Sequence, residues 1–596
     1  MNNQLRLPRP GVSAALAAAA CACASWIRQY FGADAGSMAL ALCCLLLMLC
    51  AAALRPTRKE AAACAVTGAA FGVMHTLGYS YDTMDSYGLI LKNAGTLIGG
   101  MLCMIALSAT AFCVCLILVR VLDAMKNACM REGTVEAGER KKLFLFCTGV
   151  IFLGSVPYLA LYAPGLNIFD THDQLLQFFG YPSYIGDGSV LTDHHPVFLS
   201  VVYAAFIKIG LLFGNANIGQ MLYSLTSMAV LSAAWAYALC MLYDLGLSRK
   251  VCMGLAGFVA LYPVLALYAF NMCKDVSAAP FVLIYAAQMV KLYRSEGEAA
   301  KDRRFLFVLA ANAFVLMLTR KPSMYALAFA AVFQVVFYRG VRMRLAAALF
   351  GSLALFFVGY SSLLLPALGV VPGEAREMLS IPFQMTARYY HTYPDDITPE
   401  ENEAVSRVLD VGSFANYDPR LSDPVKDTSN PEMNGSDLTA YLKAWLSMGV
   451  RHPGVYLDAW LNMIYGYFYP STSNTIVCLT LNSPDKGGMN LRQDERLDDL
   501  RLEFHDFIYY TLRRLPGAGM LFFVNTVTWA FLFLLVYAVL RGGIGAAMPW
   551  MFFVGTLGIC MLSPKSGEIR YLMPILYALP VMFGAVILPD KKERNA

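Results

Sequence analysis

The sequence predicts an all-α membrane protein that crosses the bilayer many times. Of its 596 residues, 58% are hydrophobic and 15% are charged, whereas a soluble domain is about 45–50% apolar and about 25% charged. Apolar runs of roughly 17–25 residues, long enough to cross about 30 Å of hydrocarbon as a helix, recur along the chain. Lipid offers no partner to an unpaired backbone group, so helices are the expected spanning elements.

The apolar runs predict about fourteen transmembrane helices. They are expected near residues 12–30, 37–54, 61–78, 95–119, 143–162, 218–243, 251–270, 276–290, 305–319, 323–337, 345–366, 519–540, 546–562 and 571–588.

One further apolar run, residues 196–213, decides the orientation of everything that follows it. If this run does not span, most of the later Lys and Arg residues fall in loops on one side, which is the bias expected of the cytoplasmic side. Lys208, in the middle of the run, would also cost roughly 2.5–3.5 kcal/mol at the bilayer centre. We therefore expect an interfacial helix at the outer surface, with both termini in the cytoplasm.

This topology divides the chain into segments of different character. They are a four-span N-terminal addition (1–122), a basic cytoplasmic loop (123–142), a membrane core (143–366) with an outer loop at 163–217, a mixed outer soluble domain (367–518), three C-terminal spans (519–588) and a cytoplasmic tail (589–596). We find no internal or inverted repeat of the kind that many transporters carry.

The first outer loop predicts a short helix with one polar face. Asp170, Asp173, Gln174 and Gln177 are spaced i, i+3, i+4 and i+7, so they share a helical face. A carboxylate held on such a helix can act as a general base. The alternative is an amphipathic loop helix whose carboxylates are only solvated.

A second polar group opens the predicted interfacial helix. Asp193, His194 and His195 stand directly before Pro196. Imidazole and carboxylate are ordinary ligands of zinc or manganese, but they also cap helices and donate or accept hydrogen bonds. The sequence therefore assigns no metal ligand and no certain cofactor, and it leaves a divalent cation open.

Three junctions at the predicted outer ends of spans carry charge. They are Lys274 with Asp275, Arg320 with Lys321, and Glu568 with Arg570. A lipid phosphate would lie at this depth, and Arg binds phosphate through two parallel hydrogen bonds while Lys binds it as a point charge. Snorkelling at a helix end explains any one of these residues alone. Their convergence on one face favours phosphate binding.

These residues resemble a known family of membrane enzymes. An Asp-centred helix (PGLNIFDTHDQLLQ), a His-Pro that opens a second apolar helix (HHPVFLSVVYAAFIKIG), and Lys-Asp, Arg-Lys and Arg-Tyr pairs at span ends are similar to GT-C superfamily glycosyltransferases. The nearest resemblance is to uncharacterised bacterial GT-C-like proteins, distantly similar to protein O-mannosyltransferases and aminoarabinose transferases. It runs from about residue 143 to 588, so the first four spans look like an addition.

The resemblance implies roles for individual residues. Asp170 corresponds to the base that deprotonates the acceptor, with Asp173 second in line. This chain departs from the family by spacing its acidic residues as Asp-Thr-His-Asp where many relatives have adjacent ones, which leaves the choice between Asp170 and Asp173 open. The lipid phosphate would be held by Lys274, Arg320 and Arg570. The remaining expected substrate-binding residues are Gln174, Gln177, His194, His195, Asp275, Lys321 and Tyr571.

The resemblance also implies a function, a donor and a location. We expect an inverting glycosyltransferase that moves a sugar from a polyprenyl-phosphate donor to an envelope glycan, lipid or protein acceptor. The enzyme would be an integral protein of the bacterial plasma (inner) membrane, with its catalytic face outside. A transporter or lipid flippase is one alternative, although transporters usually keep ionisable residues near the bilayer midplane. A glycan polymerase or ligase is another. The sequence contains no nucleotide-binding loop, and its net charge of +5 does not suggest a nucleic-acid partner.

Overall fold

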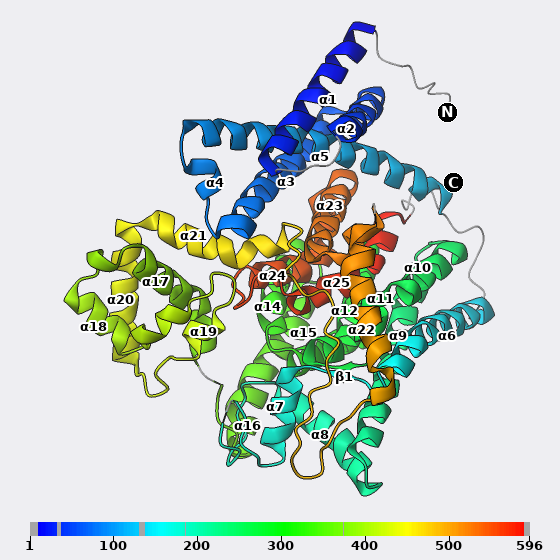
Figure 1. Cartoon of the computed structure of the whole chain (residues 1–596). Coiled ribbons are helices and arrows are strands. Elements are labelled where there is room, and N and C mark those ends of the chain that lie inside the picture. Colours follow the sequence, from blue (N-terminus) through cyan, green and yellow to red (C-terminus); the bar gives the residue numbers. More distant parts are fainter. Residues whose placement is uncertain are drawn as a thin grey trace.

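The computed structural model describes residues 10–31, 37–129, 137–184, 186–373, 375–515 and 517–588, and in these the chain is nearly all helical (Figure 1). Helices make up 77% of the structure, which confirms a helical membrane protein. The predicted tail, residues 589–596, and residues 130–136 of the predicted basic loop lie outside the described residues.

Eight helical segments among the described residues are long and apolar enough to cross a membrane, not the about fourteen predicted. They are α3 (Arg58–Met84), α5 (Ala94–Ala128), α6 (Ala137–Leu161), α9 (Ala216–Asp244), α12 (Lys274–Arg294), the continuous segment of α15 (Arg342–Ala354), η2 (Leu355–Leu364) and α16 (Leu365–Ala367), α23 (Val524–Gly542) and α25 (Ile569–Val586).

The first predicted span is a continuous helix of 22 residues, α1 (Pro10–Phe31), and the four-residue α4 (Gly88–Leu91) lies between two predicted spans. Several other predicted spans are shorter or broken helices. They include α2 (Ser37–Ala53), α10 (Arg249–Leu261), α11 (Pro263–Tyr268), α13 (Arg303–Thr319), α14 (Ser323–Phe337), η11 (Ile544–Trp550) and α24 (Met551–Cys560). The predicted span at 251–270 illustrates the cause. Tyr262 has an extended ψ of 107° because the ring of the following Pro263 disfavours helical backbone before it, so α10 ends and α11 begins there.

A two-residue parallel ladder holds the first turns of two helices next to each other. β1 (Leu166–Asn167) pairs with β2 (Asn271–Met272). β1 leads into α7 (Phe169–Phe178) and β2 leads into α12. Because parallel strands run in the same direction, the first turns of α7 and α12 begin side by side.

Helix α8 (Val197–Leu212), the expected interfacial helix, packs against α7 and against the first turns of α9. Its 16 residues give a length of about 24 Å, shorter than the hydrocarbon layer. Gly219 permits the close approach to α9, since a Cβ there would lie 2.2 Å from the Phe206 carbonyl oxygen. Lys208 is exposed on α8, and its Nζ lies 5.1 Å from the centre of the Phe178 ring.

The segment predicted as a mixed outer domain is built from helices, with isolated bridges in place of a sheet among its described residues. Residues 375–464 lie to one side of the helix bundle, whereas the last helix of the segment lies against the bundle (Figure 1). The helices of the segment are α17 (Ser380–Thr392), α18 (Pro399–Ser406), α19 (Asp423–Lys426), α20 (Gly435–Arg451), α21 (Pro453–Ile464) and α22 (Asp498–Asp506). The first four helices share a separate hydrophobic core that includes Phe383, Tyr389, Val408, Phe414 and Tyr441.

The N-terminal helices are tied to the rest of the chain at both ends of α3. At its first turn, Glu60 forms ion pairs with Arg120 of α5 and Arg541 of α23. At its C-terminal end, the Asp85 carboxylate accepts hydrogen bonds from Arg420 in the outer segment. The expected addition therefore contacts both the bundle and the outer helices.

Candidate functional site

The strand ladder brings Asp170 next to Lys274. Asp170 is the second residue of α7 and Lys274 is the first residue of α12, and each follows its paired strand by only two or three positions. The Lys274 Nζ lies 2.8 Å from the Asp170 Oδ2. A lysine in the first turn of a helix is disfavoured by the helix dipole, so its carboxylate partner offsets that cost.

Arg570 reaches the same carboxylate from a distant part of the chain. It stands in the first turn of α25, where Glu568 caps the helix by accepting a hydrogen bond from the Arg570 backbone N–H. The Arg570 Nη1 lies 3.3 Å from the Asp170 Oδ2. Glu568 also pairs with Lys565 at 2.8 Å. Three segments far apart in sequence thus meet at one oxygen atom.

This carboxylate is partly open and strongly ionised. The side chains of Asp170, Lys274 and Arg570 are 21%, 22% and 19% exposed. Burial by itself would raise the pKa of Asp170, but the positive charges of Lys274 and Arg570 outweigh it and hold that pKa well below its ordinary value. An accessible anion placed between two cations can exchange those cations with a second anion such as phosphate.

His195, Asp193 and Lys321 border the cluster. The His195 Nδ1 lies 3.4 Å from the Lys274 Nζ. Burial and the nearby Lys274 charge hold the pKa of His195 well below its ordinary value, so the ring is neutral at pH 7. The Lys321 Nζ lies 2.7 Å from the Asp193 Oδ2, and burial raises the pKa of Asp193 while Lys321 opposes that rise.

Arg320 and Asp275 form a different kind of pair. Both side chains are 2% exposed, and the Arg320 Nε lies 2.7 Å from the Asp275 Oδ1. The Arg320 Nη2 also donates to the backbone carbonyl of Tyr571 at 3.2 Å. This buried pair joins the first turns of α12 and α25, and sequence reasoning could not distinguish the buried Arg320 from its neighbour Lys321, which is 23% exposed.

The other polar residues of α7 face the protein. Asp173 is 2% exposed and lies 3.4 Å from the His172 Nδ1. Gln174 donates to the Ser200 hydroxyl at 3.1 Å and Gln177 to the Thr192 hydroxyl at 2.8 Å. Three residues of the predicted four-residue face, Asp173, Gln174 and Gln177, are therefore buried, and Asp170 alone is partly exposed. Of the two carboxylates, only Asp170 contacts the cations.

His194 shows how the outer helices approach the site, a contact that the sequence did not predict. Its ring lies 4.7 Å from that of His195, centroid to centroid. Its pKa is lowered chiefly by burial, while the Glu377 charge opposes that shift. Glu377 in turn pairs with Lys426 of α19 at 3.1 Å. The Ser422 N–H donates to the Pro564 carbonyl at 2.8 Å. Pro564 lies in the segment that leads into α25, so the outer helices contact the chain just before Arg570.

The described residues contain no group of three or more His, Cys, Asp or Glu side chains that could hold a metal ion. Asp193 is occupied by Lys321, and His195 contacts Lys274. The Asp-His-His run therefore lies in a network of charged side chains.

An apolar groove follows α25 away from the cluster. Its volume is about 370 Å³, and its walls come from α10, α23 and α25, among them Phe258, Val527, Leu576 and Phe583. Arg570 and Leu576 are six positions apart on α25, a rise of about 9 Å. A cationic helix end and a groove fit for hydrocarbon thus lie along the same helix.

Residues 185–596 match a family of unknown function, DUF6020. The match covers more than half of the chain, which therefore belongs to this family. No curated protein and no solved structure matches the chain. The matched segment includes Lys274, Lys321 and Arg570 and begins after Asp170.

Proposed function

We propose that this member of DUF6020 is a glycosyltransferase of GT-C type, which moves a sugar from a polyprenyl-phosphate donor to an acceptor at the outer face of a bacterial plasma membrane. The observation that carries the proposal is the partly exposed Asp170 held between Lys274 and Arg570. A phosphate requires cations, an acceptor hydroxyl requires a base, and this cluster contains both.

In the proposed donor complex, the lipid phosphate takes Lys274 and Arg570 as partners. Arginine provides two parallel donors and lysine a compact charge. Lys321, 23% exposed beside Asp193, adds a third cation at the rim. The isoprenoid chain follows the apolar groove along α25. The buried Arg320–Asp275 pair positions the first turns of α12 and α25 and does not bind the phosphate directly.

Donor binding also prepares the base. Without a second anion, Lys274 and Arg570 lower the pKa of Asp170, which makes its carboxylate a weak base. A phosphate that draws these cations away raises the pKa of Asp170. The carboxylate then accepts the proton of the acceptor hydroxyl, whose oxygen attacks the anomeric carbon. The bond from that carbon to the phosphate oxygen breaks, and the phosphate leaves with the electron pair, so configuration inverts.

The typical rate contributions of a base and of charge stabilisation support separate roles for Asp170 and for the cations Lys274 and Arg570. A positioned base contributes about 10²- to 10⁴-fold in rate, and charge stabilisation of the oxyanion-hole type contributes about 10²- to 10³-fold for one donor. A water-excluding site strengthens both effects. The outer helices that approach through Glu377 and Lys426 are suited to exclude water from the acceptor side.

The depth of the charges favours an enzyme over a transporter. Asp170, Lys274 and Arg570 all stand in the first turns of their helices, whereas transporters usually bind ions and substrates near the midplane. The proposal puts this end of the bundle outside, both termini in the cytoplasm, and the shorter apolar helices among about fourteen spans. A glycan polymerase or ligase would use the same surface chemistry with a larger acceptor.

The test compares envelope glycans and lipids in cells that carry Asp170→Asn in place of the wild-type chain. We expect a missing sugar modification and accumulation of the lipid-linked donor. The control is Asp187→Asn, a change in the same outer loop at a carboxylate that hydrogen-bonds to Ser189, and it should leave the profile normal. A normal profile from well-expressed Asp170→Asn would refute the proposed role of Asp170.

A further inference from the structure

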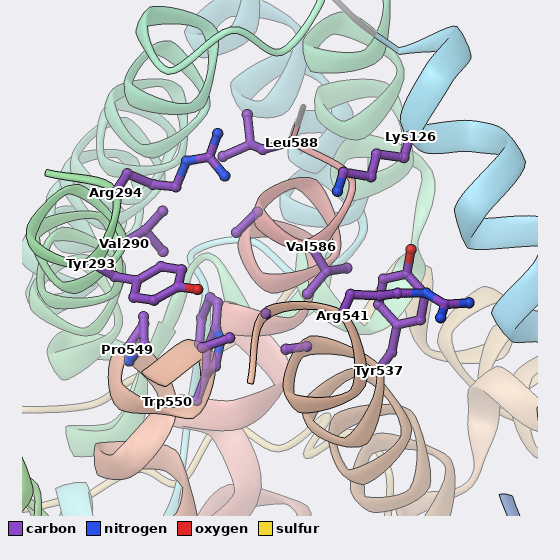
Figure 2. A pocket seen from close by; sticks show the side chains of 14 residues that line it. Lys126, Val290, Tyr293, Arg294, Tyr537, Arg541, Pro549, Trp550, Val586 and Leu588 are labelled. Carbon is purple, nitrogen blue, oxygen red and sulfur yellow. The ribbon is translucent and has the colours of Figure 1, made fainter. Parts of the chain in front are cut away.

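Helix α3, in the N-terminal part of the chain, is fixed to the bundle at its first turn. Its 27 residues rise about 40 Å, more than the thickness of the hydrocarbon layer. Glu60 of this turn pairs with Arg541 of α23 at 2.7 Å. Figure 2 shows Arg541 beside Tyr537, whose ring centre lies 5.9 Å from the guanidinium carbon, and Tyr537 donates to Asp123 of α5 at 3.0 Å. One end of α3 is therefore held by two other helices.

At the other end of α3, two aspartates bind the outer segment. The Asp82 carboxylate accepts hydrogen bonds from the Tyr465 hydroxyl at 3.2 Å and from the Ser471 hydroxyl at 2.6 Å. The Asp85 carboxylate accepts from the Arg420 Nη2 at 3.2 Å, and the same nitrogen donates to the Asp82 carbonyl at 3.1 Å. Carboxylates at the C-terminal end of a helix are disfavoured by the helix dipole. Because Arg420 offsets that cost, these acids serve the contact with the outer segment.

The backbone of Asp85 adds to this contact. The Asp85 and Arg420 side chains are 42% and 32% exposed, and an ion pair so exposed contributes little alone. Asp85 has a φ of 52°, in the left-handed region that Asp adopts more readily than most residues. Its carbonyl accepts from the Arg388 Nη2 of α17 at 2.8 Å and from the Asn462 Nδ2 of α21 at 2.7 Å. Two outer helices and Arg420 thus meet α3 at one residue.

The residues that bind the end of α3 also bind the segment that leads to α25. The Arg420 side chain contacts α3, and the Arg420 carbonyl accepts a hydrogen bond from the Ser566 N–H at 2.9 Å. Tyr465 also contacts α3, and the N–H of the next residue, Gly466, donates to the Ser566 hydroxyl at 3.2 Å. Two separate connections therefore run from the last turn of α3 to Ser566.

Ser566 is close to the candidate site in sequence and in space. Gly567 alone separates it from Glu568, which caps α25 and lies 3.6 Å from the Arg570 Nε. A Cβ added at Gly567 would lie 2.2 Å from a side-chain nitrogen of the outer segment, so this stretch is closely packed. A shift of Ser566 would therefore move the first turn of α25, and with it the Arg570 Nη1 that lies 3.3 Å from the Asp170 Oδ2.

We propose that Asp85 and Arg420 are positioning residues for Arg570, through which the N-terminal helices set the geometry of the phosphate site. The inference rests on the proposed function, because binding of the donor phosphate by Arg570 is part of it. The coupling from α3 to α25 can nevertheless be measured without turnover. The helix that carries Asp85 precedes the segment matched by the family model, residues 185–596. The N-terminal helices thus act as a scaffold for a site built by the rest of the chain.

The first experiment measures hydrogen exchange of the backbone amides of residues 565–571 in the purified full-length protein in detergent. Arg420→Gln removes the charge that binds α3, so these amides should exchange about tenfold faster than in wild type. Arg420→Lys retains the charge and should recover part of the protection. The control is Arg407→Gln, which breaks an exposed pair with Glu403 in the same outer segment and should exchange as wild type does.

The second experiment measures binding of a polyprenyl monophosphate to the same proteins. Its affinity should be about tenfold weaker in Arg420→Gln, the order of effect that loss of one hydrogen bond to a charged group gives, and unchanged in Arg407→Gln. Because Arg570 itself is intact in Arg420→Gln, a higher donor concentration should restore most of the transfer rate. The KM for the donor should therefore rise more than kcat falls.

A further variant keeps the outcome decisive if Arg420→Gln does not fold. Asp85→Asn removes one charge and keeps a side chain that suits left-handed backbone, so it should speed exchange at residues 565–571 by a smaller factor. Wild-type exchange there in the folded variants, or an equal rise in the amides of α12, would overturn the proposal. Faster exchange confined to residues 565–571, together with no binding of polyprenyl monophosphate by wild type, would instead refute the proposed function and support the coupling.

Discussion

Two carboxylates in this protein each bind two cations from separate helices, yet they are built differently. Glu60 is 2% exposed, and its two oxygens are shared between Arg120 and Arg541. Asp170 is 21% exposed, and both of its cations contact the same oxygen, Oδ2. The Glu60 carboxylate is closed to solvent, whereas the partly exposed Asp170 carboxylate leaves room for another ligand.

The backbone around Glu60 also holds its carboxylate more tightly than the backbone around Asp170 does. The Thr57 backbone N–H donates to Glu60, which completes a capping box at the start of α3. Asp170 stands after Ile168, which provides no side-chain cap. A carboxylate whose oxygens are fully used holds helices together, whereas one that is partly open to water can perform chemistry. The comparison therefore distinguishes a structural carboxylate, Glu60, from the carboxylate of the candidate functional site, Asp170.

The largest predicted effect concerns the open carboxylate. Asp170→Asn keeps the size of the side chain and removes the base, so transfer should fall by about 10²- to 10⁴-fold while the thermal stability of the protein changes little. Measured sugar transfer in membranes that contain equal amounts of each protein checks this. A loss of folded protein that parallels the loss of transfer would mean that Asp170 is structural, as Glu60 is.

The closed carboxylate should show the reverse behaviour. Glu60→Gln leaves Arg120 and Arg541, which are 31% and 29% exposed, with Asp123 as their remaining carboxylate partner, at a cost of about 1–3 kcal/mol. We expect a lower midpoint of thermal unfolding in detergent. The control is Glu403→Gln, which breaks an exposed pair with Arg407 and should change stability by about 0.5 kcal/mol or less. Equal stability of the two variants would contradict the comparison.

Removal of one cation at the open site should weaken the donor interaction. Arg570→Gln takes away one phosphate partner, so transfer should fall by about 10²- to 10³-fold. Arg570→Lys retains the charge and should recover part of the rate. If Arg570→Gln and Arg570→Lys are equally inactive, the role of Arg570 is to pack α25, and phosphate binding does not require its charge.

The smallest predicted effect is a dependence of stability on pH. His195 has a folded pKa held well below its ordinary value by burial and by Lys274, so the unfolded chain binds the extra proton first. Stability should therefore fall as the pH drops below about 6.5. Thermal unfolding at pH 7.5 and 5.5 should show a smaller pH effect in His195→Gln than in wild type. Substitution of His505, whose side chain is 42% exposed, should leave the effect unchanged, and a His195→Gln protein with the full wild-type pH effect would exclude this origin.

The sequence predicted the membrane class and the helical content because apolar length and low charge follow directly from the solvent that a helix must occupy. It overestimated the number of long spans because Pro263 divides one apolar run into two short helices and because other runs form helices of only 15 to 17 residues, such as α2, α13 and α14. A window of hydropathy does not register such a break.

The site was predictable only in part. Lys274, Arg570 and Asp170 each stood out as a charge beside an apolar run, but the two-residue ladder that joins Leu166 to Asn271 is too short to carry a strand pattern. Burial of Arg320 and of Asp173 depends on which helix covers each side chain, and this is a tertiary fact. The hydrogen bond from the Ser422 N–H to the Pro564 carbonyl joins segments that are distant in sequence, and no local sequence pattern indicates it.

The contacts of the aromatic segment of the outer helices also could not be predicted from the sequence. Trp445, Trp460, Tyr465, Tyr467 and Tyr469 fit either an interfacial belt or a sugar-stacking surface by composition. In the structure, Tyr467 is fully buried and its hydroxyl hydrogen-bonds with Ser563. The Trp460 indole N–H donates to the Met561 carbonyl at 3.0 Å. Both residues therefore join the outer helices to the segment before Arg570.

The most direct test of the central claim separates binding of the donor phosphate from the chemical step. Binding of a polyprenyl monophosphate to the purified protein should be at least tenfold weaker in Lys274→Gln than in wild type. Asp170→Asn, which releases the two cations from their carboxylate, should bind it as tightly as wild type or more tightly and still fail to transfer sugar. Absence of binding by the wild-type protein, or loss of binding in Asp170→Asn, would contradict a phosphate site built around Asp170.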